Sequence, residues 1–424
     1  MGPIKSTPSL PLDRADPAPV TSDTVKMLTT PFHERTSAAN ETGLWSHWAG
    51  HLVVTKYQID EKVEYFALRN AAGVLDTSAL FKYRIYGRDA ERLLSGVLAR
   101  DIRKCRPGKA QYTMWCDDRG FLIEDGVVLR TSSDEFLLTS AEPNLAYLES
   151  MIGGDQVAVE NITDRYGILA VQGPASRTIL STLAPEVEDL RFFALTPAKI
   201  GDASVIISRT GYTGDLGYEI WADAADATDV WDAVTAAGAG RGLLPYGSLV
   251  MHMARIEAGL LLIDVDYETS RFAWIDEQRA TPIELGYGWM FKRLDRDDRA
   301  FVGRGAIERE LADGSSRFRL VGLDIDWRSY QRAHLDVGLP PIKDNVPVEW
   351  ALMVYDDARR VVGHASSFMY SPLLQRHIAI ARLSPALAAP GTRVRIEVTI
   401  NNLNYLVDAA TRRLPFFNPA RKTA

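Results

Sequence analysis

The chain has 424 residues, of which 46% are hydrophobic and 24% charged, and its formal net charge is −7. This length suffices for two or three domains with apolar cores, and the negative charge excludes a general attraction to nucleic acid or a membrane surface. The two cysteines, Cys105 and Cys116, exclude a disulfide framework and an all-cysteine zinc site, and no apolar run reaches the roughly 18 residues of a bilayer span, so we predict a cytoplasmic protein with no metal site and no signal peptide.

Residues 1–26 contain five prolines and few large apolar side chains, which predicts a mobile or extended arm. Residues 30–60 are rich in aromatic and histidine side chains. These are Phe32, His33, Trp45, His47, Trp48, His51 and Tyr57. Two interpretations remain open for this segment, namely ordinary core packing and one wall of a substrate site. A helix is expected to follow and to stop near Gly73.

Residues 83–87 alternate like a strand, and Asp89 is expected to cap an amphipathic helix. A hairpin follows, with residues 111–116 as the first strand, residues 117–120 as the turn and residues 121–128 as the return strand. Glu124 and Asp125 interrupt the aliphatic return strand. Successive side chains of a strand point to opposite faces, so one of these carboxylates points inward and needs a partner or a chemical role. A structural and a catalytic carboxylate both remain possible.

The segment from Ser208 to Trp221 places three glycines between two apolar runs, which predicts a strand, a glycine-rich loop and a second strand. An ordinary β-hairpin accounts for this pattern. Glu219 with aromatic neighbours also suits a flat heterocycle with adjacent N–H donors, because a carboxylate accepts two parallel hydrogen bonds. Residues 248–259 predict an amphipathic helix, residues 292–299 and 308–316 a linker, and residues 317–417 mostly strands, which makes the fold class α+β.

Several of these segments resemble the glycine-cleavage T-protein family of tetrahydrofolate-dependent aminomethyl and methyl transferases. Residues 208–219 are similar to the family's S-R-T-G-Y-T-G-E-x-G-[YF]-E, with Asp215 as the one conservative difference. Residues 255–260 resemble R-L-E-A-G-[LM], residues 281–289 resemble T-P-x-E-x-G-L-x-w, and residues 362–372 resemble T-S-G-x-x-S-P. The resemblance covers about residues 30–417.

The resemblance implies a fold as well as a cofactor. The expected architecture is a three-domain cloverleaf, with two intertwined α+β domains in residues 27–310, a C-terminal β-barrel in residues 317–417 and folate in a central cavity. Glu219 would hold the pterin ring of tetrahydrofolate, and Asp125 would be the catalytic carboxylate beside the reacting nitrogens. Tyr112, Tyr212 and Trp289 would complete the cofactor site.

One departure from the family bears on the reaction. Met251 and His252 stand where T-proteins usually carry an Arg-Asp pair whose arginine contacts folate. The change favours demethylation of a small O-, N- or S-methylated compound to give 5-methyltetrahydrofolate, with the aromatic segment around Trp48 holding an apolar, aromatic or cationic donor. His252 is then a candidate proton donor, although a histidine without a catalytic role is equally compatible with the sequence.

Two other functions remain open. The first is the glycine-cleavage aminomethyltransferase, which gives 5,10-methylenetetrahydrofolate and needs a lipoyl carrier protein. The second is a non-catalytic folate-binding assembly protein, but the K-G-C-Y-x-G-Q-E motif of that branch is absent from the sequence.

Overall fold

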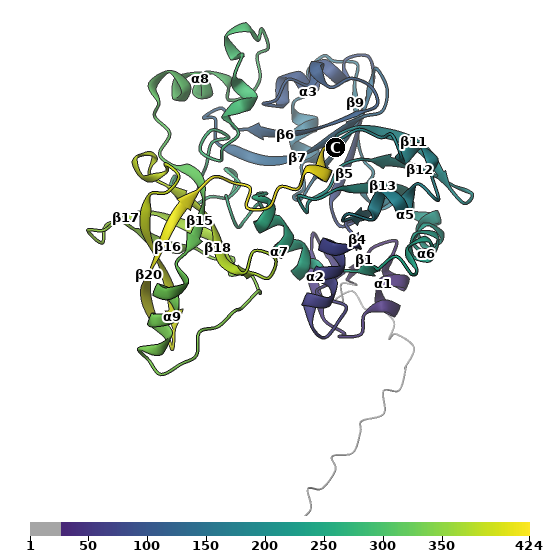
Figure 1. Ribbon diagram of the computed structural model, residues 1–424. Coiled ribbons are helices and arrows are strands. Elements are labelled where there is room, and N and C mark those ends of the chain that lie inside the picture. The colour runs from purple at the N-terminus through teal and green to yellow at the C-terminus, as the bar shows by residue number, and fades with distance from the viewer. Residues whose placement is uncertain (1–26) are drawn as a thin grey trace, which may run out of the picture.

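The computed structural model describes residues 27–424, and the predicted arm of residues 1–26 lies outside the described residues. Three bodies of secondary structure surround the helix α7, Ser248–Ala258 (Figure 1). They are a six-stranded sheet, a five-stranded sheet and a closed barrel, and a small three-stranded sheet lies at the start of the described chain. The predicted α+β class and the C-terminal barrel are confirmed. Among residues 27–424, no helix combines the length and the apolar character needed to cross a membrane.

The small sheet and two helices form the beginning of this part of the chain. Their bounds are Leu28–Thr29 (β1), His33–Ala39 (α1), Trp45–Trp48 (β2), His51–Val54 (β3) and Glu61–Asn70 (α2). Helix α2 ends at Asn70, near Gly73 as predicted, but Gly73 lies inside the next strand and Ala71 takes the cap position. A Cβ atom at Gly73 would come within 2.5 Å of the Tyr246 ring, so this glycine allows close packing within the sheet and does not end a helix.

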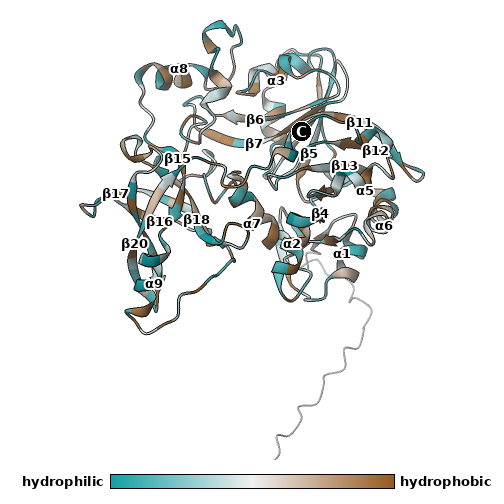
Figure 2. Cartoon of the chain, viewed as in Figure 1, coloured by the Kyte–Doolittle hydropathy of each residue, from teal (hydrophilic) through white to brown (hydrophobic). Residues whose placement is uncertain are grey.

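The six-stranded sheet has the order β11-β12-β13-β10-β4-β14. Its strands are Ala72–Asp76 (β4), Tyr166–Gln172 (β10), Leu195–Ile200 (β11), Ala203–Ser208 (β12), Gly217–Asp223 (β13) and Leu243–Pro245 (β14). The helices Ser176–Leu180 (α5) and Ala227–Gly238 (α6) pack against one face, and α2 and α7 contribute to the apolar cluster on the other face. Figure 2 shows hydrophobic residues along these strands, as expected for a sheet buried on both faces.

The five-stranded sheet is inserted in sequence between β4 and β10. Its order is β6-β7-β8-β5-β9. The elements are Phe81–Tyr86 (β5), Ala90–Val97 (α3), Lys109–Cys116 (β6), Leu122–Arg130 (β7), Glu135–Ser140 (β8), Leu145–Ser150 (α4) and Ala158–Asn161 (β9). The predicted hairpin is present as β6 and β7. Asp89 occupies the cap position of α3, but its side chain accepts a hydrogen bond from the Gln156 amide and does not cap the helix.

Helix α7 joins the sheets to the barrel. Glu257 accepts hydrogen bonds from Arg69 of α2 at 2.6 Å and from Ser371 of the barrel at 2.6 Å. Arg255, which is fully buried, donates to Asp266 at 2.6 Å and to Ser367 of the barrel at 2.9 Å. The motif around Arg255 and Glu257 therefore fixes the relative position of two parts of the chain that are more than 100 residues apart.

The barrel closes in the order β15-β18-β17-β16-β19-β20. Its strands and covering helix are Arg319–Ile325 (β15), Trp327–Leu335 (α9), Leu352–Tyr355 (β16), Val361–Ser371 (β17), Arg376–Leu383 (β18), Arg393–Ile400 (β19) and Leu403–Arg412 (β20). The prediction of a linker over residues 308–316 was wrong in part, because Arg304–Asp313 forms helix α8, which is capped by Gly314 with a φ of 61°. The buried Ile307 holds this helix against the rest of the protein.

The C-terminal segment returns from the barrel to the six-stranded sheet (Figure 1). Arg421 forms two hydrogen bonds, of 2.6 and 2.8 Å, to the buried carboxylate of Asp215. The carbonyl oxygen of Ala424 accepts hydrogen bonds from Arg209 at 2.6 Å and from Arg177 at 3.1 Å. The last residues of the chain therefore contact the glycine-rich loop between β12 and β13.

Candidate functional site

The two adjacent carboxylates of β7 point in opposite directions. Glu124 is buried and accepts hydrogen bonds from the amides of Ala141 and Glu142 and from the side chain of Asn144, all between 2.6 and 2.9 Å. Burial raises the pKa of Glu124 to about 8, although these hydrogen bonds oppose the rise. Glu124 is therefore the inward carboxylate of the pair and has structural partners, whereas Asp125 is left on the other face, where it is only partly buried.

Asp125 accepts hydrogen bonds from two tyrosines. The hydroxyl of Tyr112 donates to one carboxylate oxygen at 2.9 Å, and the hydroxyl of Tyr267 donates to the other. Tyr112 lies on β6 diagonally across from Asp125, a position from which a long side chain reaches its neighbour on the same face of a sheet. Burial raises the pKa of Asp125, while the two phenol donors oppose the rise. The carboxylate is thus held in one orientation by partners that keep their own protons.

An aromatic row leads away from Asp125. The rings of Tyr112 and Tyr287 lie 5.2 Å apart, and those of Tyr287 and Trp289 lie 6.2 Å apart. Trp289 is 45% exposed, and the guanidinium of Arg100 lies 5.0 Å from its ring centre. The structure therefore connects two of the predicted cofactor residues, Tyr112 and Trp289, through Tyr287.

The glycine-rich loop is packed around Gln172. The side chain of Gln172 donates to the carbonyl oxygens of Thr210 and Tyr218 and accepts from Thr213. A Cβ atom at Gly211 or Gly217 would lie within 2.2 Å of this side chain, which explains both glycines. Gln172 therefore packs inside the loop, and part of the glycine pattern is structural.

Glu219 lies in the middle of β13 and is partly buried. It is paired with Ser208 on one side and with Ala170 on the other. Thr210 donates to one of its carboxylate oxygens, and the other oxygen, Oε1, accepts no hydrogen bond from residues 27–424. Burial raises the pKa of Glu219, and the Thr210 hydrogen bond opposes this. A half-satisfied carboxylate on a rigid strand is suited to receive N–H donors from a ligand.

Tyr212 connects the glycine-rich loop with the Asp125 cluster. Its hydroxyl donates to the carbonyl oxygen of Leu261, in the segment that also carries Tyr267. Burial raises the pKa of Tyr212, and the charge of Asp125 contributes to the rise, while Arg255 opposes it. Tyr212 therefore lies within electrostatic reach of Asp125, although it comes from the loop that carries Glu219.

His252 is placed differently from the other predicted site residues. Its Nδ1 atom lies 2.9 Å from Glu349, whose other carboxylate oxygen accepts from Arg255 at 2.6 Å. Glu349 precedes the first strand of the barrel after α9. The structure does not bring His252 into contact with Asp125, and its role as a proton donor stays a prediction.

Tyr267 was missed by the sequence analysis. It follows Asp266, which is buried and accepts hydrogen bonds from Arg255, Ser367 and the amide of Leu262. These bonds fix the segment after α7 and direct Tyr267 onto Asp125. The one local signal was the run of acidic residues from Asp264 to Glu268 directly after the apolar residues 260–263, because buried charges in a loop require partners.

The fold and this arrangement of residues are those of an α+β protein with a candidate ligand site at its centre, and comparison with known sequences identifies its family. A model described as the GCVT N-terminal domain matches residues 34–294, and one described as the glycine cleavage T-protein C-terminal barrel domain matches residues 319–418. The chain therefore belongs to the glycine cleavage T-protein family of folate-dependent aminomethyltransferases and demethylases, and it is an enzyme of this transferase class.

Individual relatives differ in their described activities. The aminomethyltransferase of Streptomyces avermitilis is 33% identical over 84% of this chain and 89% of its own length. The heme-dependent oxidative N-demethylase gamma subunit of Ectopseudomonas mendocina is 32% identical over 88% and 92%. The trimethylamine-oxide aldolase of Ruegeria pomeroyi is 34% identical over 87% of this chain, but the match covers only 44% of that longer relative.

A solved structure shares the fold. The aminomethyltransferase T of the Bartonella henselae glycine cleavage system superposes with a TM-score of 0.77 over 93% of this chain and 99% of its own, at 21% sequence identity. This likeness confirms the T-protein fold, including the mixed sheets and the six-stranded barrel.

Proposed function

We propose that the protein transfers a methyl group from a small O-, N- or S-methylated compound to tetrahydrofolate, giving 5-methyltetrahydrofolate. The observation that carries the proposal is the presence of two carboxylates that differ in their hydrogen-bond partners. Asp125 is oriented by two phenol donors, and one oxygen of Glu219 accepts no hydrogen bond from residues 27–424. Tyr212 lies on the loop between β12 and β13, whose second strand carries Glu219, and the charge of Asp125 contributes to raising its pKa, which supports placing both carboxylates in one site.

Tetrahydrofolate supplies the nitrogen, N5, that receives the one-carbon group. Oε1 of Glu219 would accept from the N–H donors of the pterin edge, which fits its lack of a hydrogen-bond donor in the part of the chain that the structure describes. The row of Tyr112, Tyr287 and Trp289 offers aromatic faces for stacking. Asp125 would orient the reacting nitrogen and accept its proton at a carboxylate oxygen, which its raised pKa favours. Such positioning would lower the reaction barrier by roughly several kcal/mol, as in intramolecular reactions whose reacting groups are held in the right orientation.

Two residues of α7 favour a demethylase function over an aminomethyltransferase function. By the resemblance to the family, Met251 and His252 stand in the place of an Arg-Asp pair, and His252 lies 2.9 Å from Glu349 of the C-terminal part. The relative from Ectopseudomonas mendocina, matched over 92% of its length, is described as part of an N-demethylase. The aminomethyltransferase from Streptomyces avermitilis is equally similar, so glycine-cleavage aminomethyl transfer from a lipoyl carrier protein remains the second candidate.

The product separates these two functions. The enzyme would be incubated with tetrahydrofolate and either a panel of small methylated compounds or an aminomethyl-loaded lipoyl protein, and the folate product identified by mass. Formation of 5-methyltetrahydrofolate from a methylated compound supports the proposal. Rapid formation of methylenetetrahydrofolate with release of ammonia from the lipoyl protein would refute it in favour of the second candidate.

The role of Glu219 is tested by binding. Glu219→Ala should weaken tetrahydrofolate binding by about 1.5–3 kcal/mol, since hydrogen bonds to a charged group are lost. Calorimetry compares the variant with the wild type and with Asp223→Ala, which removes an equal charge from the exposed end of the same strand. Equal affinities of the three proteins would remove Glu219 from the cofactor site.

A further inference from the structure

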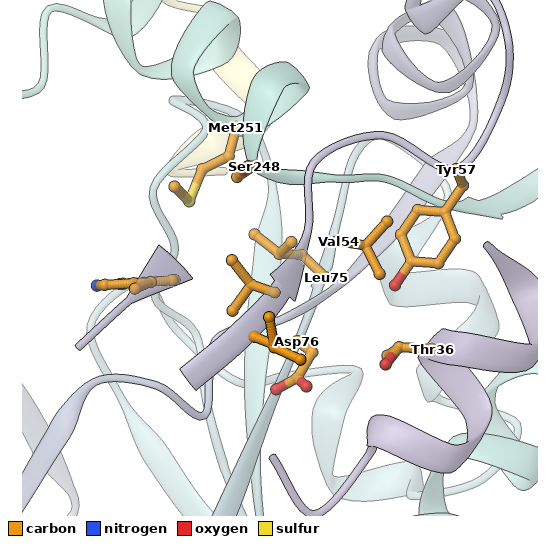
Figure 3. Close-up of a pocket in the computed structure, with 10 residues that line it drawn as sticks. Thr36, Val54, Tyr57, Leu75, Asp76, Ser248 and Met251 are labelled. Atoms are coloured by element: carbon orange, nitrogen blue, oxygen red, sulfur yellow. The ribbon is translucent and has the colours of Figure 1, made fainter. Parts of the chain in front are cut away.

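Helix α7 contacts different parts of the protein on its different sides. Met251 lines a narrow pocket between the helix and the small three-stranded sheet (Figure 3). This pocket has room for no more than about one water molecule, so it is too small for a substrate. His252 and Arg255 instead contact Glu349, which lies just before the barrel strand β16. The contacts on this second side of the helix continue as far as Asp125.

Glu349 uses both carboxylate oxygens to bind α7. Its Oε1 atom accepts a hydrogen bond from Nη2 of Arg255 at 2.6 Å, and its Oε2 atom lies 2.9 Å from Nδ1 of His252. The side chain of Glu349 is 24% exposed, whereas that of Arg255 is fully buried. Burial acts to raise the pKa of Glu349, but His252 and Arg255 together hold it below its usual value. Glu349 is therefore an ionised carboxylate at the barrel end of the contact.

Arg255 connects Glu349 with the loop that follows α7. Its Nη1 atom donates to Oδ2 of Asp266 at 2.6 Å, and Nη2, the nitrogen that binds Glu349, also donates to Ser367 at 2.9 Å. The side chains of Arg255 and Asp266 are both fully buried. A guanidinium group is planar and its N–H donors have fixed directions. The position of Glu349 on one side of the group therefore constrains the position of Asp266 on the other.

Asp266 is followed in the chain by Tyr267, whose hydroxyl donates to Asp125. The amide of Leu262 donates to Asp266 at 2.9 Å, so the carboxylate also fixes the backbone of its own loop. Burial raises the pKa of Asp125, and the hydrogen bond from Tyr267 is the largest of the effects that oppose this rise. A displacement of Asp266 is expected to weaken this hydrogen bond, because Tyr267 is buried and has little freedom to adjust.

The two hydrogen bonds to Asp125 differ in what supports them. Tyr112 lies on β6, the strand next to that of Asp125, and donates at 2.9 Å. The other donor depends on the barrel, because Ser366 and Ser367 of β17 also donate to the carboxylate of Asp266. One bond is thus internal to the five-stranded sheet, and the other depends on how the barrel meets α7.

We propose that Glu349 is a positioning residue for the carboxylate of Asp125. It acts through Arg255 and Asp266, which hold the loop so that the Tyr267 hydroxyl meets one oxygen of Asp125. The inference rests on the proposed function, which gives Asp125 its part in the reaction. It adds that a residue beside the barrel sets the ionisation of a carboxylate on another sheet.

The groups that surround Asp125 make its ionisation measurable. Burial raises the pKa values of Tyr112, Tyr212 and Tyr287, so these phenols keep their protons where Asp125 titrates. The charge of Asp266 adds to the rise of the Asp125 pKa. The increase of turnover from acid pH, the acid limb of the profile, is therefore expected to report the loss of the proton from Asp125.

The pH dependence of turnover tests the proposal. Glu349→Ala should move the acid limb to higher pH, because a weakened hydrogen bond from Tyr267 stabilises the ionised carboxylate less. Tyr267→Phe removes this hydrogen bond and should move the limb in the same direction and at least as far. At a fixed pH on the limb, each variant should lose about 3- to 10-fold in turnover, as expected for one ordinary hydrogen bond.

The double variant shows whether Glu349 acts through Tyr267. If it does, Glu349→Ala moves the limb no further in the Tyr267→Phe background, since no hydrogen bond is left to weaken. An equal shift in both backgrounds would refute the proposal, as would an unchanged limb in Glu349→Ala alone. If Glu349→Ala does not fold, Glu349→Gln replaces it in the cycle. It keeps an acceptor for the guanidinium but loses the charge, so a smaller shift in the same direction is expected.

A matched control is Asp324→Ala. Asp324 is another partly exposed carboxylate of the barrel and also pairs with two cations, Arg376 and Arg412. Its removal should leave the acid limb in place. A shift equal to that of Glu349→Ala would mean that any disturbance of the barrel has this effect, which would also refute the proposal.

A measurement without substrate separates this inference from the proposed function. The pKa of Asp125 is raised in the folded protein, so the stability that its proton contributes is present at low pH and is lost as the pH rises through the folded value. The difference in unfolding free energy between each protein and its Asp125→Asn form should therefore show the same order of shifts. If these shifts appear while no compound gives methyl transfer, positioning by Glu349 stands and the methyltransferase is refuted. Methyl transfer without any of these shifts would do the reverse.

Discussion

At the scale of single residues, two adjacent carboxylates acquire different properties from the alternation of one strand. Glu124 faces the interior and is satisfied by three N–H donors, while Asp125 faces two tyrosine hydroxyls. Sequence reasoning predicted that one of the pair points inward, since alternate side chains of a strand take opposite faces. It did not distinguish the two, because the partners of each come from other segments of the chain.

Replacement of Asp125 by asparagine should lower turnover by about 100-fold or more, in the range found for a positioned acid–base or electrostatic group. Affinity for tetrahydrofolate should change little, because Glu219 is the proposed anchor. Steady-state kinetics and calorimetry measure the two quantities, and Asp134→Asn in the exposed β7–β8 turn is the control. Near-normal turnover in Asp125→Asn would place the catalytic group elsewhere.

The raised pKa of Glu124 predicts that the free energy of unfolding depends on pH. Its pKa is raised from 4.5 in the unfolded chain to about 8 in the folded protein, so the folded state binds its proton more tightly. The stability that this proton contributes is fully present below pH 4.5 and is lost as the pH rises toward 8. Urea midpoints of the wild type and Glu124→Gln, measured between pH 5 and 8, should therefore converge or cross with rising pH. Parallel curves would show that Glu124 does not titrate in this range.

At the scale of elements, the local patterns of the sequence were sufficient for the β6–β7 hairpin, for the strand–loop–strand unit of β12 and β13 and for α7. Each is defined by turn residues or by a periodicity within about 15 residues. Tyr267 and the α8 helix were not predicted. The hydrogen bond from Tyr267 to Asp125 joins residues 142 positions apart, and no local pattern reports such a contact.

The segment after α7 depends on Asp266 for its position. Asp266→Ala removes one of the two carboxylate partners of the buried Arg255 and leaves it with Glu349, so it should destabilise the protein by up to about 3–5 kcal/mol, the range for breaking a buried ion pair. Asp232→Ala breaks an exposed ion pair with Arg35 and should cost less than about 1 kcal/mol. Urea denaturation measures both variants. A loss in Asp266→Ala no larger than in the control would mean that the segment is held by other contacts.

At the scale of the whole molecule, the cloverleaf and its barrel followed from the resemblance to a family, whereas composition and periodicity predicted only a mixed α+β fold. The reason is physical: the closure of the barrel depends on pairing between β15 and β20, whose partner residues lie about 90 positions apart. The return of the C-terminal segment to the glycine-rich loop was also not predicted, since the contact of Arg421 with Asp215 joins residues 206 positions apart.

The contact between Arg421 and Asp215 is expected to stabilise the glycine-rich loop between β12 and β13. Arg421→Ala leaves the buried Asp215 with the amide of Leu216, at 2.7 Å, and with the guanidinium of Arg69, at 3.9 Å, and should cost about 1.5–3 kcal/mol. Amide hydrogen exchange should accelerate in residues 209–217 and remain unchanged in the barrel. The control is Arg376→Ala, which removes an exposed partner of Asp324 at 3.6 Å. Exchange in the loop that is unaffected by Arg421→Ala would show that the C-terminal segment does not support it.

The insertion of one sheet within another also has a consequence for synthesis of the chain. Strand β4 leaves the ribosome about a hundred residues before β10, its antiparallel partner. At about 5–20 residues per second, Val74 and Leu75 remain without their sheet for roughly 5–20 seconds. The inserted strands β5 to β9 are complete during that interval. The nascent chain therefore closes its inner sheet first, and the six-stranded sheet that carries Glu219 assembles around a neighbour that has already folded.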